Sequence, residues 1–380
     1  MKLAILSQAY LYDDTASING TLVQLHNLTY GFKEAGIEVY YITSTKDKSK
    51  PTHEIIDGVH FYWIQAEIGI LAWKKIMKHY QSLLFLIKPD AIYVRGRNVL
   101  QYVAGIYANK HNITYVWGTN GDDSAEFWKN TKRLKHSNKF FLKKIVLYPL
   151  KIAEDFFINM GMKMAQVVIN QSIHQQQETK RILNKEGIVL PSYFFYQNKG
   201  VKKENKILWL ATLSPNKQPN VFIELVNNSS LKKWQAILGG GTKDKSYEVE
   251  ITSLIKDTSV DMIGAVDFKD SFKFYESSKI YINTSKPEAD GVPNAYIQSW
   301  LNGTVVLSLH HDPNNWMDTH NIGFCAKGNL NALKEKLQLL INKPDVLESM
   351  NANAIKFATE TFSNKAIISD YINLFKASNS

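Results

Sequence analysis

Residues 284–306 have the composition and order of a binding site for an anion. The largely apolar residues 280–283 predict a strand, and the loop after it contains Asp290, Gly291 and Pro293 before a helix begins. A helix that starts after such a loop directs free backbone N–H groups outward, and these groups bind phosphate oxygens. We therefore expect a diphosphate site here. The alternative is an ordinary strand–loop–helix connection in which Gly and Pro only mark the turn.

This stretch resembles the donor-binding motif of the GT4-type, GT-B-fold retaining glycosyltransferases, the glycosyltransferase group 1 family. When Gly303 is aligned with the family's glycine, Asp290 takes the position of the first acid and Gln298 that of the second. Glu288 is a second candidate for the first acid if the loop is shifted by two residues. The resemblance implies that the first acid binds a hydroxyl of the donor sugar and the second binds the ribose. Gln298 can still bond a ribose diol, because its carbonyl accepts and its amide donates hydrogen bonds.

The resemblance also implies further donor-binding residues. Lys217 matches by spacing a lysine that neutralises the diphosphate as the sugar leaves, although a lone loop lysine is usually a solvated charge. Thr212 stands where the family has an arginine, so one fixed cation is missing. Gly20 stands before the first long helix, where a glycine lets the backbone approach the phosphate, or it only marks a turn. The other implied residues are Gly240 in a turn below the nucleotide, Val266 in a loop at the nucleobase, and Gly291, Val292, Asn294 and Ala295 at the helix start. We expect no metal and no cofactor, since lysine and the helix dipole can replace a cation.

Three residues of the first half are candidates for binding the acceptor. Many family members have a histidine after the strand that we predict at 114–117, and this sequence has Asn120 and Asp122 instead. Asp122 is a catalytic candidate, or it caps a helix that begins near Ser124. Arg95 follows a strand predicted at 90–94, so it either meets an anionic acceptor or is a surface charge.

Residues 127–153 combine lysines and aromatic side chains without any acidic residue. This mixture suits an anionic bilayer surface, and the resemblance adds that many of these enzymes glycosylate lipid-linked acceptors. The alternative is a solvated basic helix face. We expect no nucleic-acid partner, because no recognised nucleic-acid motif accompanies the basic residues.

Composition limits the class of protein further. The chain has 380 residues, which suits two α/β domains, and a net charge of +10, which favours anionic partners. Its single cysteine, Cys325, excludes a disulfide framework. We expect no signal peptide, because the first residues enter a strand at once, and the sequence has no apolar run of about 20 residues. We therefore expect a cytoplasmic protein, with peripheral contact to the inner face of the cell membrane as an addition.

Strands alternate with helices in both halves, which predicts two domains with parallel sheets. The polar stretch 191–206 is the expected linker. The resemblance implies an α/β protein of the GT-B fold, with two Rossmann-like domains that face a deep cleft. We assign 1–195 to an acceptor-binding domain and 205–354 to a nucleotide-sugar-binding domain. The amphipathic segment 354–375 predicts a helix, and we expect residues 355–380 to pack back on the first domain.

The function implied by the resemblance is retaining transfer of a hexose-type sugar. The donor would be a UDP or GDP sugar and the acceptor a glycan or a lipid-linked sugar, in the synthesis of a cell-surface polysaccharide. The altered positions Thr212, Asn120, Asp290 and Gln298 leave a second hypothesis open. In it, the protein is a catalytically weakened relative that only binds nucleotide sugars or glycans.

Overall fold

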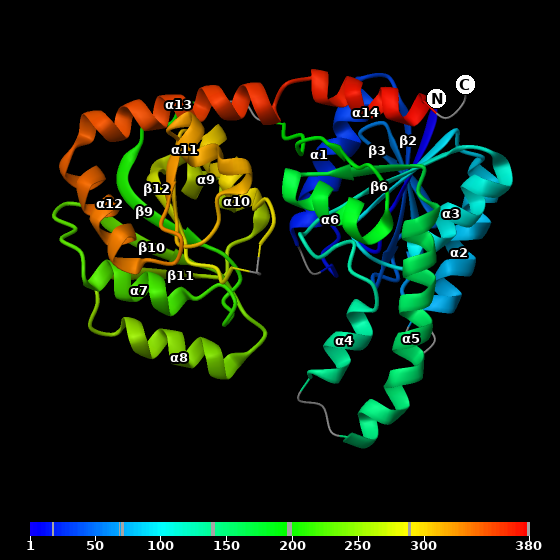
Figure 1. Cartoon of the computed structure of the whole chain (residues 1–380), viewed down its shortest axis with the longest axis horizontal. Coiled ribbons are helices and arrows are strands. Elements are labelled where there is room, and N and C mark those ends of the chain that lie inside the picture. The colour runs from blue at the N-terminus through cyan, green and yellow to red at the C-terminus, as the bar shows by residue number, and fades with distance from the viewer. Residues whose placement is uncertain are drawn as a thin grey trace. The chain divides into compact units, whose positions relative to one another are not determined.

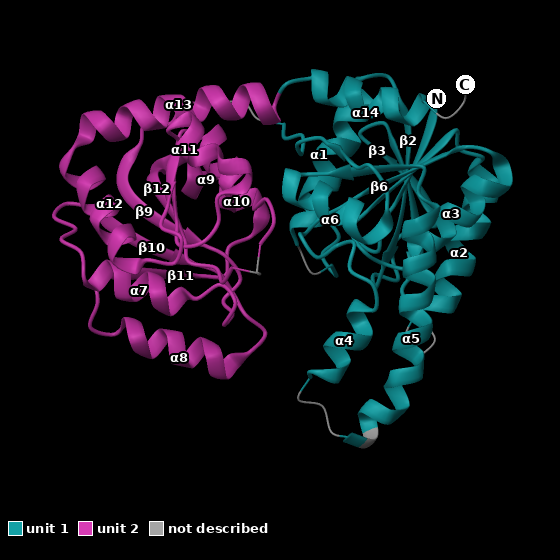
Figure 2. Ribbon diagram, viewed as in Figure 1, with its two compact units in different colours: residues 1–195, 364–380 teal, residues 196–363 magenta. Residues whose placement is uncertain are grey.

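The chain folds into two compact units, each built on its own sheet (Figures 1 and 2). Unit 1 comprises Met1–Phe195 and Asn364–Ser380, and unit 2 comprises Tyr196–Ser363. The computed structural model describes residues 1–16, 19–67, 69, 72–137, 141–195, 200–287 and 290–377. The boundary between the units falls inside the stretch 191–206, where the linker is predicted.

In the described residues, unit 1 has an eight-stranded sheet in the order β3-β4-β2-β1-β5-β6-β7-β8. Neighbouring strands are parallel except β3 and β4, which form an antiparallel hairpin. Residues 3–6 of β1 are all fully buried, because helices cover both faces of a parallel sheet. The strands are β1 (Lys2–Leu6), β2 (Glu38–Thr45), β3 (His53–Ile56), β4 (Val59–Gln65), β5 (Ala91–Arg95), β6 (Thr114–Gly118), β7 (Val167–Asn170) and β8 (Ile188–Val189).

The helices of unit 1 connect these strands. They are α1 (Gly20–Glu34), α2 (Ala72–Ile87), α3 (Leu100–His111), α4 (Lys129–Lys135), α5 (Phe141–Met164), α6 (Ile173–Leu183) and α14 (Ala366–Lys376). The predicted helix start near Ser124 is wrong, because this residue lies in a turn and α4 begins only at Lys129.

The end of the described chain belongs to the core of unit 1. Ile367, Tyr371 and Phe375 of α14 are buried against residues of α1 and the sheet. Gly31 of α1 makes this packing possible, because a side chain there would overlap Ile368. The single helix predicted over 354–375 is wrong: α13 ends at Phe362 in unit 2, and α14 begins at Ala366. The side chain of Asn364 accepts a hydrogen bond from the Ala366 N–H group (2.9 Å), which starts the second helix separately.

Helices α4 and α5 form a hairpin that extends from unit 1 (Figure 1). Asp155 of α5 holds the two helices together, and its side chain is fully buried. It accepts hydrogen bonds from the backbone N–H and the hydroxyl of Thr131, both at 2.8 Å, and pairs with Arg97 at 2.9 Å. A buried carboxylate needs such partners, because an unpaired charge in the interior is costly.

In the described residues, unit 2 has a six-stranded parallel sheet in the order β11-β10-β9-β12-β13-β14. The strands are β9 (Glu204–Leu210), β10 (Gln235–Gly239), β11 (Val260–Gly264), β12 (Ser278–Asn283), β13 (Val305–Ser308) and β14 (Gly323–Cys325). The helices are α7 (Pro219–Asn227), α8 (Lys245–Ile255), α9 (Phe268–Ser277), α10 (Asn294–Leu301), the 3-10 turn η1 (Pro313–Asn315), α11 (Trp316–His320), α12 (Leu330–Asn342) and α13 (Pro344–Phe362). The sheet order reverses at β9, which lies between β10 and β12. In open α/β sheets, ligands bind beside the carboxyl ends of strands at such a reversal.

Candidate active site

The loops after β9 and β12 bring Lys217 and Asp290 together. The ammonium of Lys217 forms an ion pair with Oδ1 of Asp290, and the two side chains are 25% and 12% exposed. Asn283 is the last residue of β12. Its amide nitrogen lies 3.4 Å from Oδ2 of the same carboxylate. The cation and the acid that the sequence predicts for donor binding are therefore neighbours in unit 2. Sequence analysis missed Asn283, although its place at the strand end is a signal for it.

Hydrogen bonds fix the two loops to each other. The hydroxyl of Thr284 donates to the carbonyls of Lys217 (2.9 Å) and Gln218 (2.8 Å), and it accepts from the indole N–H of Trp209 (2.9 Å). The N–H of Lys286 donates to the carbonyl of Asn216 at 2.9 Å. These contacts hold the Lys217 backbone in one position, and the ion pair with Asp290 orients its ammonium.

The charges of the site are balanced within it. Burial raises the pKa of Asp290, but the adjacent Lys217 ammonium and hydrogen bonds from Lys217 and Ser285 outweigh this and lower the pKa below its usual value. Asp290 is therefore ionised at neutral pH. It can accept a hydrogen bond from a sugar hydroxyl, and it orients the ammonium of Lys217.

The carboxyl ends of β9, β10 and β11 form the rest of this edge. Gly240, with a φ of +147°, lies against the β9 loop, and a side chain there would overlap the carbonyl oxygen of Ala211. Its N–H donates to the carbonyl of Gly264 at 2.8 Å, which links the ends of β10 and β11. Thr212 is exposed beside this turn, and Val266 is half-buried just beyond β11. The three predicted positions thus follow three adjacent strands.

Helix α10 begins directly after the loop that carries Asp290. Asn294 and Ala295 are its first two residues, and Pro293 before them makes no side-chain hydrogen bond to the first turn. Val292 is buried and Gly291 is half-buried in the loop. One turn further on, Gln298 is 5% exposed, and its Nε2 has no hydrogen-bond partner among the described residues. Glu288, the alternative first acid, lies outside the described residues.

The predicted residues of unit 1 gather in part at the carboxyl end of β6. Asp122 accepts a hydrogen bond from Gln175 of α6 at 3.1 Å, and the N–H of Asn120 donates to the hydroxyl of Ser124 at 3.1 Å. Both residues are half-buried. Gly20 is the first residue of α1, where the Asn19 side chain caps the helix by accepting from the N–H groups of residues 21 and 22. The side chain of Asn19 thus already occupies these two backbone donors at the start of α1.

Arg95 lies in the interior of unit 1, so both sequence-based interpretations of it are wrong. It is 2% exposed, and its guanidinium donates to Gln24 (2.6 Å), to the hydroxyl of Tyr93 (2.9 Å) and to Ser192 (3.3 Å). These bonds engage all three nitrogens of the guanidinium in holding α1, β5 and the segment after β8 together. We no longer assign Arg95 to the acceptor.

Comparison with solved structures identifies the fold. Sucrose-phosphate synthase from Thermosynechococcus elongatus matches with a TM-score of 0.72 at 13% identity, covering 99% of this chain and 98% of that one. WaaG, a glycosyltransferase involved in lipopolysaccharide biosynthesis, matches with 0.67 at 13% identity, covering 98% and 99%. A TarM mutant from S. aureus, in complex with fondaparinux, alpha-GlcNAc-glycerol and UDP, matches with 0.68 at 12% identity, covering 98% and 99%. The chain has the GT-B fold, as the sequence predicts.

The sequence of unit 2 matches a known family. Residues 194–357, almost the whole of that unit, match the family described as glycosyl transferases group 1. Unit 2 is therefore similar to the group 1 glycosyltransferases. Among curated proteins, no sequence matches the chain.

In the described residues, no group of three or more His, Cys, Asp and Glu side chains is placed to hold a metal ion. None of the helices in the described part of the chain is long and apolar enough to cross a membrane.

Proposed function

We propose that the protein transfers a hexose-type sugar from a nucleotide-diphosphate sugar, UDP- or GDP-linked, to a glycan or a lipid-linked acceptor, with retention of anomeric configuration. The ion pair of Lys217 and Asp290 at the end of β12, just before α10, carries this proposal. It offers a cation for the diphosphate and a carboxylate for a sugar hydroxyl within one rigid pair of loops.

In the proposed reaction, the bond between the anomeric carbon and the diphosphate breaks while the acceptor oxygen bonds to that carbon. Negative charge develops on the diphosphate, and Lys217 with the N–H groups of Asn294 and Ala295 would stabilise it without a metal. The acceptor attacks from the side of the leaving group, and a phosphate oxygen takes the acceptor proton. Asp290 would hold the sugar ring, and Asp122 would hold the acceptor.

A panel of UDP- and GDP-sugars tests the donor. The midpoint of thermal unfolding is measured in the presence of each compound. It should rise with either the UDP-sugars or the GDP-sugars, because a ligand that binds only the folded state stabilises it. Proton NMR of the product of that donor with a lipid-linked or glycan acceptor should show the anomeric configuration of the donor. Inversion would refute the retaining mechanism.

The fold also serves other chemistry on nucleotide sugars. A putative UDP-N-acetylglucosamine 2-epimerase from Listeria monocytogenes matches with a TM-score of 0.58 at 10% identity, covering 100% of this chain and 96% of that one. The second hypothesis, a protein that binds nucleotide sugars without transferring them, uses the same site. The donor that stabilises the protein is incubated first without and then with acceptors, and this separates the cases. Formation of a new epimer without acceptor indicates epimerisation. A donor that stays unchanged under both conditions indicates binding alone.

Replacement of Gln298 by alanine is expected to weaken nucleotide binding by about tenfold, because two hydrogen bonds to the ribose each contribute roughly 0.5–1.5 kcal/mol. The unpartnered Nε2 of Gln298 supports this role. Calorimetry with UDP and GDP measures the change. Ser299→Ala on the same helix is the control, since Ser299 is equally buried and its hydroxyl has no partner in the described residues. Equal affinity of Gln298→Ala and wild type would place the ribose elsewhere.

We also propose that the α4–α5 hairpin contacts an anionic membrane surface from the cytoplasmic side. Its apolar side chains are unusually exposed, with Phe141 at 71%, Val146 at 58% and Ile145 at 53%. Lys143 is exposed beside them. Apolar side chains at an exposed helix end, flanked by lysines, suit insertion at the level of lipid headgroups.

The charge reversal Lys143→Glu is expected to lower binding to phosphatidylserine vesicles by at least about fivefold, since each lysine near such a surface contributes about 1 kcal/mol. Phe141→Ser should weaken it too, through lost apolar burial. Vesicle flotation measures both. Lys243→Glu, an exposed lysine of unit 2, serves as the control for net charge. If all three variants float like wild type, the hairpin is not the contact.

A further inference from the structure

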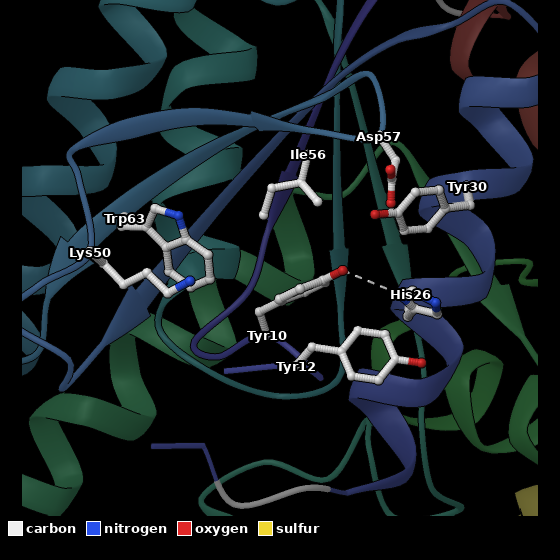
Figure 3. Close-up of a pocket in the computed structure, with 8 residues that line it drawn as sticks. All are labelled: Tyr10, Tyr12, His26, Tyr30, Lys50, Ile56, Asp57 and Trp63. Atoms are coloured by element: carbon white, nitrogen blue, oxygen red, sulfur yellow. Dashed lines mark hydrogen bonds between the residues drawn. The ribbon is translucent and has the colours of Figure 1, made fainter. Parts of the chain in front are cut away.

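Unit 1 contains a cavity of about 290 Å³ that lies between α1 and the β3–β4 hairpin (Figure 3). Its volume is close to the lower limit of roughly 300 Å³ for small-ligand pockets. It is separate from the carboxyl end of β6, where Asn120 and Asp122 lie, because β2, β1 and β5 stand between β4 and β6 in the sheet. None of its lining residues has a role in the transfer reaction proposed above.

Aromatic rings form most of the cavity surface. Tyr10 lies at its centre, with its ring centroid 6.1 Å from that of Trp63 on one side and 6.1 Å from that of His26 on the other (Figure 3). Tyr10 and Trp63 are each 4% exposed, whereas Tyr12 at the entrance is 39% exposed. Tyr30 continues the row, with its ring centroid 4.8 Å from that of His26. The cavity thus offers several ring faces and edges at different angles.

Polar groups are concentrated along one side of the same cavity. The hydroxyl of Tyr10 lies 3.4 Å from Nδ1 of His26, and the Asp57 carboxylate points toward the hydroxyl of Tyr30 (Figure 3). Burial lowers the pKa of His26 to about 4, so its imidazole is neutral at pH 7, with one nitrogen donating and the other accepting. This side can therefore both donate and accept hydrogen bonds with a neutral partner.

The charges at the cavity do not select a charged ligand. Lys50 holds its ammonium 4.7 Å from the centroid of the Trp63 ring and 3.6 Å from Glu54, so a cation–π contact already exists there. Lys50 and Asp57 carry opposite charges, so together they favour neither a cation nor an anion. A neutral ligand with an apolar face and a rim of hydroxyl groups remains, and a pyranose ring has this form, because its C–H groups stack on aromatic faces while its hydroxyls point outward.

We propose that this cavity is a binding site for a neutral pyranose residue of a glycan, distinct from the transfer site. Tyr12 stacks on the ring, and His26, Tyr30 and Asp57 bind its hydroxyls. A glycan chain held here would stay associated with the protein between transfer steps. The proposal stands without the transfer reaction, because the site lies wholly within unit 1 and needs no nucleotide.

The test measures saccharide binding to the full chain in the absence of nucleotide. Methyl α-glucopyranoside, methyl α-galactopyranoside and N-acetylglucosamine are titrated by saturation-transfer NMR, with choline chloride as a cationic probe. At least one saccharide is expected to bind, and Tyr12→Ala should weaken that binding at least about tenfold by removing a stacking face. Phe85→Ala, which removes a ring of nearly equal exposure (40%) from α2, should not change it.

Three results would overturn the proposal. They are no binding of any of the three saccharides, saccharide binding that Tyr12→Ala leaves unchanged, and stronger binding of choline than of the saccharides. An Asp57→Asn variant adds a second readout, the preference between the glucoside and the galactoside. Loss of the Asp57 carboxylate should change this preference. Local unfolding would not do so, and Asp57 is exposed, so its replacement should not unfold the cavity. Both variants retain the residues proposed for the donor, so loss of saccharide binding with unchanged nucleotide affinity separates this site from that of unit 2.

Discussion

Replacement of Lys217 by alanine is expected to lower kcat for sugar transfer by about 10²- to 10³-fold, the usual loss when one group that stabilises a developing negative charge is removed. In unit 2, Lys217 is the cation that pairs with Asp290, and the carbonyls around it are fixed by Thr284. With Thr212 at the position of the family's arginine, the proposed site depends more heavily on this one side chain. Turnover with a saturating donor and acceptor measures the effect.

The alanine variant also leaves the Asp290 carboxylate without its cation, so part of its effect can come from lower stability. Lys217→Gln addresses this, because its amide can still donate a hydrogen bond to Asp290 but carries no charge. The charge is responsible if Lys217→Gln unfolds like wild type and loses activity as Lys217→Ala does. Turnover at the wild-type rate by either variant would remove Lys217 from the mechanism.

Replacement of Gly240 by alanine is expected to destabilise unit 2 by more than about 4 kcal/mol, which is exceptional for a single substitution. A Cβ atom at this position would overlap the backbone oxygen of Ala211, and a φ of +147° is a conformation that side chains rarely adopt. In a unit of this size the midpoint of thermal unfolding should fall by more than about 8 °C. Thermal unfolding followed by circular dichroism, together with nucleotide affinity, measures the loss.

Gly264→Ala is the matched control. Gly264 ends the neighbouring strand β11 and also has a positive φ, of +71°, but no atom lies within 4 Å of a side chain built there. Gly264→Ala should lower the free energy of unfolding by only about 1–2 kcal/mol, because only the backbone conformation opposes the new side chain. Equal stability losses in the two variants would show that the contact with Ala211 is unimportant and that the conformation of glycine is what matters.

The parallel cores could be predicted because their signal is local. Residues 3–6 and 280–282 are short continuous apolar runs, and both are buried strands at the places the sequence indicates. Such runs are characteristic of strands covered on both faces. The break at 363–365 was missed because the apolar spacing of α13 and α14 is nearly continuous across it, and only the cap at Asn364 marks the new start.

The site could be predicted only as separate pieces. The ion pair between Lys217 and Asp290 joins positions 73 residues apart in the chain, and no local pattern indicates which lysine meets which acid. Arg95 shows the opposite failure: a strand-end arginine looks the same in sequence whether it faces solvent or lies among Gln24, Tyr93 and Ser192. The aromatic cavity was missed because Trp63 reaches Tyr10 only through the pairing of β4 with β2 and of β2 with β1.

The place of α14 has a consequence for synthesis on the ribosome. Ile367, Tyr371 and Phe375 complete the core of unit 1, yet they are translated after the whole of unit 2. Unit 2 is continuous and can fold as soon as it emerges, whereas the N-terminal unit must wait with an open apolar surface. The usual order, in which the first domain made is the first to fold, is therefore reversed at the last step. During that interval, the uncovered face of α1 is where a chaperone would bind the nascent chain.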